Sequence, residues 1–498
     1  MEQGIWQNIL YGFQINLLPA NLFYCFVGVL IGTLVGVLPG LGSAAAMSLL
    51  LPSTFALKPA SAIIMLAGLY YGAMYGGSTT SILVNIPGEA SSVPTCLDGY
   101  QMARKGRAGA ALGMSAFGSF IGGTISTILL MVVAPPLANI ALQFGPPEYF
   151  SLIILGFVML TYLAAGSMGK AFMMALFGVI LGCVGMDVIT GAPRFVYGIP
   201  ALSDGIGLVP VIMGLFGISE VLLNVEHEME ERELYTNEVK GLLPNRDDWR
   251  KSMGPIIRGT GLGFMLGALP GGGAVVSSFA SYAVEKRISK YPEKFGTGVI
   301  EGVAGPETAN NAACSGCLVP MLTLGIPSNV VMAILIGALL IHGVEVGPML
   351  AQNHPDVFWG VIASMYIGNG MLLLLNLPLI GIWVKILKIP YPILFPLILL
   401  FCLIGVYSLN NNVIEIIIMI VFGIVGYFMK KFDYEAAPLV FALVLGPMLE
   451  NTLRQSLLLS NGSLAIFVKR PISTGLLAVT GILLLLALIR RPVAASED

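Results

Sequence analysis

Long apolar runs constrain this chain most, because they are long enough to cross a lipid bilayer. Residues 117–140 and 357–384 contain no charged side chain, and about 20 apolar residues span the hydrocarbon core as a helix. Only 10% of all residues are charged, against roughly 25% in ordinary soluble domains. We therefore expect an all-α polytopic membrane protein with roughly 11 to 14 membrane segments.

Two kinds of proline break interrupt the apolar sequence, and they stand at matching places in the two halves. Leu-Pro-Gly stands at residues 38–40 and 269–271, and Ile-Pro at residues 86–87 and 326–327. Proline removes a backbone donor and glycine permits non-helical dihedrals, so helices end or kink at such positions. In lipid, the freed backbone must be satisfied by protein or by a water-filled cavity. Matching breaks in two halves therefore indicate a transporter's binding site.

A charged central segment divides the chain into two parts that resemble each other weakly. We expect a first transmembrane repeat over residues 1–225, a charged cytoplasmic linker over 226–258 and a second repeat over 259–450. Residues 451–498 then form a C-terminal segment with the last transmembrane helix. Four correspondences in the same order make chance similarity between apolar helices the weaker interpretation.

Basic residues in equivalent loops predict that the two repeats have opposite orientations. After the Leu-Pro-Gly break, the first half has only Lys58, whereas the second half has Lys286, Arg287, Lys290 and Lys294. After the Ile-Pro break, the bias reverses. Short cytoplasmic loops are enriched in Lys and Arg, so we predict inverted-topology repeats with the N-terminus outside. Each Leu-Pro-Gly break then lies in a re-entrant or broken helix, at the tip of a hairpin.

The breaks lie in segments without basic residues, between Lys58 and Arg104 and between Lys294 and Lys385. An anion bound there would be held by backbone N–H groups at broken-helix N-termini and by neutral polar side chains. The residues that we predict to bind substrate are Pro39, Gly40, Gly42, Ser43, Asn85, Pro87, Gly88, Pro270, Gly271, Gly272, Gly273, Thr308, Asn310, Asn311, Pro327 and Ser328.

Two acids, Glu89 and Glu307, lie beside the breaks. Acids within membrane segments are costly and usually functional, as ion ligands or proton carriers. A helix-capping or interfacial carboxylate is the alternative. Unwound carbonyls and hydroxyl oxygens can also coordinate sodium. Our candidates for a coupling-ion site are Glu89, Thr79, Ser81, Glu307 and Asn310.

Motifs of several other protein classes are missing from the sequence. There is no GxxxxGK[ST] loop for ATP hydrolysis and no basic patch suited to nucleic acid. Cys314 and Cys317 form a CxxC without a second pair or nearby histidines, which a zinc site would need. We predict a protein that is not an enzyme and has no metal site or cofactor, apart from a co-transported Na⁺ or H⁺.

Five long motifs together resemble one family. They are GVLPGLGSAAAMSLLLP (residues 36–52), YYGAMYGGSTTSILVNIPGE (70–89), LPGGGAVVSSFASYAVEKR (269–287), EGVAGPETANNAACSGCLVPMLTLGIPS (301–328) and FDYEAAPLVFALVLGPMLENTLRQSLLLSNGS (432–463). The combination is similar to the TctA family, the large membrane subunits of tripartite tricarboxylate transporters, and the similarity extends over essentially the whole chain.

The resemblance implies a multi-pass protein of the bacterial inner membrane. Such subunits work with a small TctB-type membrane subunit and a periplasmic TctC-type binding protein. They import citrate or related carboxylates by symport with a sodium or proton gradient, without ATP. We therefore expect a secondary carboxylate transporter with alternating access. The alternatives are a channel-like membrane protein and a transporter for a non-carboxylate small solute.

Overall fold

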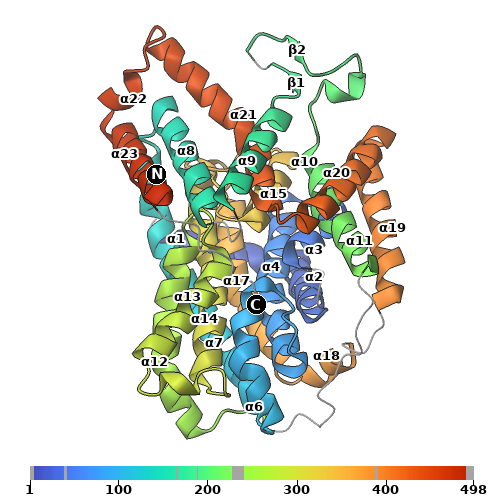
Figure 1. The fold of residues 1–498 in the computed structure, drawn as a ribbon, viewed down its shortest axis with the longest axis vertical. Coiled ribbons are helices and arrows are strands. Elements are labelled where there is room, and N and C mark those ends of the chain that lie inside the picture. Colours follow the sequence, from blue (N-terminus) through green and yellow to red (C-terminus); the bar gives the residue numbers. More distant parts are fainter. Residues whose placement is uncertain are drawn as a thin grey trace. The chain divides into compact units, whose positions relative to one another are not determined.

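The computed structural model describes residues 5–38, 42–163, 167–187, 189–226, 241–386 and 391–489 (Figure 1). Regular structure in these ranges is helical except for the antiparallel strands β1 (Gly185–Met186) and β2 (Pro193–Arg194). Among the described helices, five are long and apolar enough to cross a membrane: α2 (Pro19–Val37), α7 (Ala108–Ala141), α17 (Pro355–Asn376), α20 (Val413–Lys431) and α21 (Ala436–Leu459). The expectation of an all-α polytopic membrane protein is confirmed.

The chain divides into two compact units. Unit 1 comprises Met1–Ala141 and Gly207–Phe428, and unit 2 comprises Leu142–Ile206 and Met429–Asp498. Besides α2, α7, α17 and most of α20, unit 1 contains α1 (Ile5–Asn16), α3 (Ser43–Leu50), η1 (Leu51–Thr54), α4 (Pro59–Val84), η2 (Ala90–Ser92), α5 (Val93–Thr95), η3 (Cys96–Tyr100), α6 (Gln101–Arg104), α10 (Leu208–Ile212), η5 (Met213–Ile218), α11 (Ser219–Glu226), α12 (Arg246–Gly267), α13 (Gly273–Ile288), η6 (Pro292–Lys294), α14 (Glu301–Leu324), α15 (Val330–Ile341), α16 (Leu350–Asn353), α18 (Ile380–Ile386) and α19 (Tyr391–Asn410).

Unit 2 is smaller. It contains α8 (Pro146–Leu163), α9 (Met168–Gly182), β1, β2, η4 (Pro200–Leu202), α21, α22 (Ile466–Lys469) and α23 (Pro471–Ile489). Ion pairs tie the segment around β1 and β2 to α21. Asp187 accepts hydrogen bonds from the backbone of Thr190 and from Arg454, and Arg194 pairs with Glu450 at 2.7 Å.

All four proline breaks interrupt helices of unit 1. The Leu-Pro-Gly breaks separate α2 from α3 and α12 from α13, and the Ile-Pro breaks follow α4 and precede α15. Helices α4 and α14 end in the same way, with a residue in the left-handed region: Asn85 at φ 60° and Gly325 at φ 70°. A left-handed residue ends a helix because it turns the chain out of the helical path.

In each half, the helix before the Leu-Pro-Gly break packs on the helix that ends near the Ile-Pro break through a ladder of glycines. In α2, Gly28, Gly32 and Gly36 lie directly on the backbone of α4. A Cβ atom at these positions would lie 2.1–2.3 Å from the carbonyl oxygens of Met65, Leu69 and Ala73. Glycine at every fourth position lets two membrane helices approach until their backbones touch.

The second half repeats this contact. Gly259, Gly263 and Gly267 of α12 lie on the backbone of α14, where a Cβ atom would approach the carbonyl oxygens of Gly305, Ala309 and Ala313 to 2.2–2.6 Å. In each half the last glycine stands two residues before the leucine of the Leu-Pro-Gly break. The repeats are therefore equivalent at the level of single backbone contacts.

Equivalent helices of the two halves run in opposite directions. On α4, the Tyr70 hydroxyl lies 4.0 Å from the Cys317 Sγ of α14. Further along α4, Ser78 donates a hydrogen bond to Glu307, which lies earlier in α14. Residues later in α4 contact residues earlier in α14, so the two helices are antiparallel.

Helices α7 and α17 show the same relation. Gly123 of α7 faces Asn369 of α17, and Met131, further along α7, accepts a hydrogen bond from Tyr366 at 2.9 Å. The two halves are thus inverted relative to each other, as the loop charges predicted. Each of these helices also packs on the other repeat: α7 on α12 and α14, and α17 on α2 and α4.

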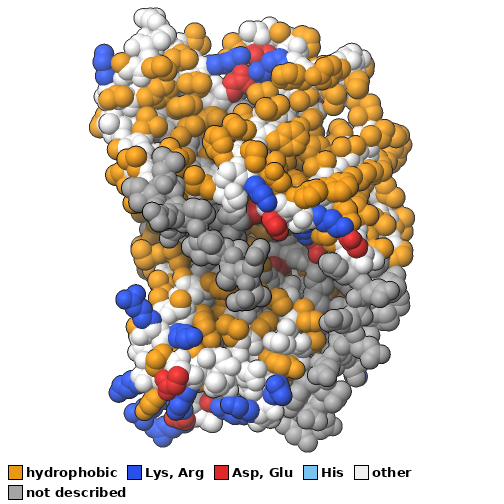
Figure 2. All heavy atoms as spheres, in the orientation of Figure 1, with side chains coloured by type: hydrophobic (Ala, Val, Ile, Leu, Met, Phe, Trp, Pro, Cys, Tyr) orange, Lys and Arg blue, Asp and Glu red, His pale blue; other side chains and the backbone are white. Residues whose placement is uncertain are grey.

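Basic loops from the two halves meet at one end of unit 1. Lys105 donates to the Thr297 carbonyl at 2.5 Å, and Arg107 pairs with Asp248 near the start of α12 at 2.5 Å. Figure 2 shows Lys and Arg side chains gathered where α6 and the start of α12 lie in Figure 1. The end that we predict to face the cytoplasm therefore carries basic side chains from both repeats.

A buried carboxylate fixes the loop that precedes α14. Asp98 is fully buried and accepts hydrogen bonds from the backbone N–H groups of Gly296, Gly298 and Val299 at 2.7–3.0 Å. It also accepts a hydrogen bond from the Tyr282 hydroxyl at 3.0 Å. Asp98 belongs to the first half and its partners to the second, so it holds the start of α14 against the first repeat.

Candidate functional site

A buried acid lies between the two repeats. Glu307 of α14 is fully buried and accepts hydrogen bonds from the hydroxyls of Ser78 on α4 and Thr95 on α5. Asn310, one turn further along α14, donates to the same carboxylate at 3.4 Å. In the part of the chain that the structure describes, no Lys, Arg or His pairs with Glu307. The carboxylate is therefore surrounded by neutral donors from both halves.

Two asparagines and a serine continue this cluster toward α7. Asn311 donates to the Ser119 hydroxyl at 2.8 Å and to the side-chain Oδ1 atom of Asn310 at 2.7 Å, while Ser119 donates to the Glu307 backbone carbonyl at 3.2 Å. The Oδ1 atom of Asn311 is buried and has no donor among the described residues. An unpaired acceptor beside a carboxylate is a suitable oxygen ligand for a cation.

The first Ile-Pro break packs on the end of α2. Gly88 lies so close to α2 that a Cβ atom would stand 1.9 Å from the Gly36 carbonyl oxygen. Glu89 packs over Gly77 of α4. The break therefore lies against both α2 and α4.

The second Ile-Pro break is joined to the tip of the second hairpin. The Gly271 N–H donates to the Ser328 carbonyl at 2.8 Å, and Gly273 faces the Asn329 side chain. Gly271 and Gly273 have φ values of 79° and 57°, which favour glycine. Asn329 caps α15 and donates to the Tyr70 hydroxyl at 3.2 Å. This tip thus reaches α4.

The predicted residues fall into separate groups. The Glu307 cluster contains Asn310 and Asn311, whereas most of the other predicted positions lie at the four breaks. Thr308 donates within α14, to Ala304, and Ser81 donates to Ser92 rather than to Glu307. Thr79, Gly88 and Ser328 are buried, Asn85 is exposed, and Pro87 and Glu89 are intermediate. Pro39 and Gly40 lie outside the described residues.

Residues that sequence reasoning left out of the site complete the cluster. Ser78, Thr95 and Ser119 contact Glu307 or its backbone. Ser78 stands in the run Ser-Thr-Thr-Ser, where the sequence gives no reason to prefer one hydroxyl over its neighbours. Only the packing of α4 against α14 selects it.

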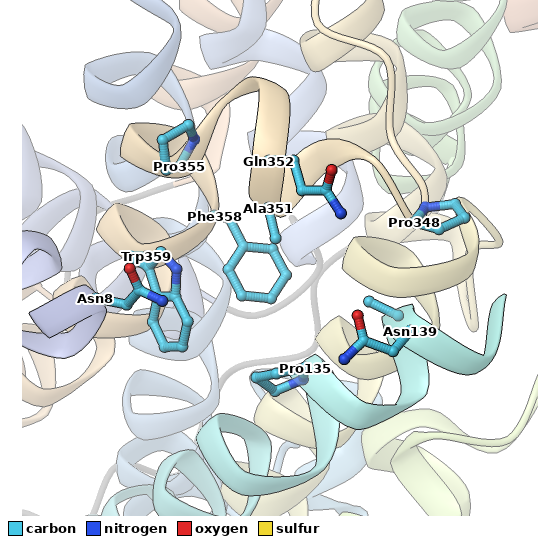
Figure 3. Close-up of a pocket in the computed structure, with 10 residues that line it drawn as sticks. Asn8, Pro135, Asn139, Pro348, Ala351, Gln352, Pro355, Phe358 and Trp359 are labelled. Atoms are coloured by element: carbon cyan, nitrogen blue, oxygen red, sulfur yellow. The ribbon is translucent and has the colours of Figure 1, made fainter. Parts of the chain in front are cut away.

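The described part of unit 1 also contains a pocket, with a volume of about 580 Å³. It lies between the end of α7 (Pro135, Asn139), the loop and helix before α17 (Gln352) and the start of α17 itself (Phe358, Trp359). Figure 3 shows the Phe358 ring between Asn139 and Gln352 on one side and Trp359 on the other. Since α7 begins beside the basic loops, this pocket lies toward the other end of unit 1. None of the predicted site residues lines it.

The sequence model of the tripartite tricarboxylate transporter TctA family matches residues 22–441 of this chain. The chain belongs to the TctA family. An Agrobacterium vitis protein described as "uncharacterized 52.8 kDa protein in TAR-I ttuC′ 3′ region" is 52% identical over 472 residues, which cover 95% of this chain and 94% of that protein. No solved structure matches the chain.

A second Agrobacterium vitis relative is shorter. It is described as "uncharacterized protein in TAR-II ttuC′ 3′ region" and is 52% identical over 227 residues, which cover 46% of this chain and 94% of the relative. The region matched by the TctA model includes all four breaks, α4 and α14. The Glu307 cluster therefore belongs to the part of the chain that defines its family, a family of transporter subunits.

Proposed function

We propose that this protein is the large permease subunit of a binding-protein-dependent secondary transporter. It imports tricarboxylates or related carboxylates across the bacterial inner membrane with a Na⁺ or H⁺ gradient, by alternating access. A TctB-type subunit and a TctC-type binding protein complete the system. Membership of the TctA family supports the transport class, and the buried Glu307 carries the proposal of cation coupling.

The argument for coupling rests on the cost of burying charge. An ionised carboxylate removed from water without an opposite charge is strongly destabilised, and it is retained where a proton or cation compensates it. Glu307 is fully buried, and its described partners are hydroxyls and an amide. A coupling cation, Na⁺ or H⁺, supplies the missing positive charge. Asn311 Oδ1 offers an additional oxygen ligand beside it.

The substrate-binding positions that we propose remain those around the breaks, together with Asn310 and Asn311. Both Ile-Pro breaks contact the same helix, α4. The first Ile-Pro break contacts Gly77, and the second reaches Tyr70 through Asn329. Seven residues of α helix correspond to roughly 10 Å. A substrate moving from one break to the other would therefore remain close to Glu307.

Uptake by the reconstituted three-component transporter tests the proposal. Proteoliposomes receive radiolabelled citrate, with an imposed Na⁺ gradient or an imposed pH gradient. We expect saturable accumulation with one of the gradients. Glu307→Gln should abolish the dependence on that gradient, because it removes the charge that the cation neutralises. Glu301→Gln, in the first turn of the same helix, serves as the matched control and should retain coupled uptake.

Three outcomes would contradict the proposal in different ways. Citrate flux that never exceeds equilibrium would indicate a channel. Accumulation of another class of solute with no response to carboxylates would indicate a different substrate. Coupled uptake that survives Glu307→Gln would leave the transport class intact but move the coupling site away from Glu307.

A further inference from the structure

An unpaired amide on α17 faces two of the helices that also contact Glu307. Asn369 of α17 is 2% exposed, and its Nδ2 atom has no acceptor among the described residues. The Oδ1 atom of the same side chain accepts a hydrogen bond of 3.5 Å from the Tyr75 hydroxyl of α4. Tyr75 therefore orients the amide so that its donor points away from α4.

The free donor faces α7, where the neighbouring residue is glycine. A Cβ atom at Gly123 would lie 2.6 Å from Asn369 Nδ2 and 3.0 Å from its Oδ1. The absence of a side chain at Gly123 thus leaves room for the amide. It also leaves Asn369 Nδ2 without a side-chain acceptor on the helix that it faces.

Two independent helices place Asn369 beside the Glu307 cluster. On α4, Tyr75 contacts Asn369 and Ser78 contacts Glu307. On α7, Gly123 faces Asn369, and Ser119 donates to the Glu307 backbone. Residues three or four apart on a helix are neighbours separated by about 5–6 Å. The contacts of Asn369 and of Glu307 are therefore about one turn apart along both α4 and α7.

A buried donor without an acceptor destabilises a fold, because it has lost its hydrogen bonds to water. Such a group needs an explanation, and a bound acceptor supplies one. We propose that Asn369 donates to a carboxylate group of the transported substrate, with Tyr75 as the residue that positions its amide. This inference rests on the proposed carboxylate transport and adds a binding residue that does not belong to the proline breaks.

The proposed arrangement also explains how the cation and the substrate depend on each other. A cation at Glu307 and a carboxylate at Asn369 would lie beside residues about one turn apart along α4 and α7. Opposite charges at this distance attract, and the attraction is stronger in a site that excludes water. Each ligand therefore increases the affinity for the other, as linkage requires. The substrate should bind more tightly when the coupling cation is present.

Asn369→Leu tests the inference, because leucine has a similar volume and no donor. We expect the affinity for the carboxylate to fall by about tenfold to a hundredfold, the usual worth of one hydrogen bond to a charged group. Leucine removes the unpaired Nδ2 donor but also the acceptor of the buried Tyr75 hydroxyl, so the melting temperature of the substrate-free protein should change little. An asparagine with only a structural role would give a clear decrease in melting temperature and no change in affinity.

Asn376→Leu is the matched control on the same helix. Asn376 is also buried, and its Nδ2 atom already donates to the Leu372 carbonyl at 3.0 Å, although its Oδ1 atom has no donor among the described residues. Because its donor is occupied, this substitution should leave the affinity for citrate unchanged. Citrate binding to the purified transporter is measured by calorimetry, with and without the coupling cation, so binding is separated from transport.

Gly123→Ala provides a second variant that probes the same space from α7. The added methyl group meets the movable end of the Asn369 side chain, so the fold should persist while citrate affinity falls. Unchanged affinity in both Asn369→Leu and Gly123→Ala would overturn the inference. If the wild type binds no carboxylate, the proposed function fails instead. A wild type that transports citrate beside equally active variants would refute the role of Asn369 alone.

Discussion

The glycine ladders allow a sharp test, because one helix contains both a tightly packed glycine and a free one. A Cβ atom at Gly263 of α12 would lie 2.2 Å from the Ala309 carbonyl oxygen of α14. A Cβ atom at Gly261, two residues earlier, would have nothing within 4 Å. The two positions share a helix and a residue type but differ in their contacts.

We expect Gly263→Ala and Gly261→Ala to have effects of opposite sign on stability. Real Cβ atoms essentially never come within 3.0 Å of such an atom, so Gly263→Ala must separate α12 from α14 by about 0.8 Å. Overpacking of this kind costs about 1–3 kcal/mol. Gly261→Ala adds no clash and gains helix propensity, up to about 1 kcal/mol. The two variants should therefore differ by about 1–4 kcal/mol in the free energy of unfolding.

Thermal unfolding of the detergent-solubilised protein measures the difference, and citrate uptake provides a second readout. Ala309 lies two residues after Glu307 and directly before Asn310. Displacement of α14 at this position should reduce uptake in Gly263→Ala and leave Gly261→Ala active. Equal melting temperatures for the two variants would refute the close backbone contact between α12 and α14, and with it the ladder that defines the repeats.

Other perturbations address other parts of the chain. Asp98→Asn should weaken the hydrogen bonds from donors such as the Gly298 N–H, lower the free energy of unfolding by about 1–3 kcal/mol in total and so lower the melting temperature. An unchanged melting temperature would contradict the anchoring of α14 by Asp98. The Thr190 N–H, with help from Arg454, holds the pKa of Asp187 below its usual value, so its stabilisation is present above about pH 4 and is lost as the pH falls further. Asp187→Asn should therefore lower the melting temperature at pH 7 and reduce the difference from wild type at pH 3. Ala351→Cys, at the pocket, should react with a membrane-impermeant thiol reagent added to intact cells from outside; protection under these conditions would reverse the predicted orientation.

The sequence was informative about the fold because the breaks and loop charges act locally. Proline and glycine end helices whatever surrounds them, so the ends of α2, α4, α12 and α14 follow from residue type. The inverted relation followed from basic loops such as the one at Lys286. A further signal was present and unused: Gly28, Gly32 and Gly36 recur as Gly259, Gly263 and Gly267 at the same distance from the Leu-Pro-Gly break.

The site was harder to predict, because it depends on contacts between distant helices. Glu89 and Glu307 both stand near breaks in the sequence, but only Glu307 is fully buried and contacts hydroxyls from the other half. Thr95 and Ser119 could not be connected with Glu307 before α5 and α7 were placed. Asn369 offered a fainter signal as an amide within the long apolar run 357–384, where polar residues are costly.

The equivalent helices α4 and α14 pack in the same way but differ in their acidic residues, and this difference fits the proposed transport. Ala73 of α4 and Ala313 of α14 accept the same glycine contact in their own repeats. Aligning their left-handed caps, Asn85 and Gly325, shows that the first repeat has no acid equivalent to Glu307. Glu307, where α14 contacts Ser78 of α4, stands six residues, roughly 9 Å along the helix, before Ala313. One acid at the contact between inverted equivalent helices can serve as the single coupling group of the proposed alternating access.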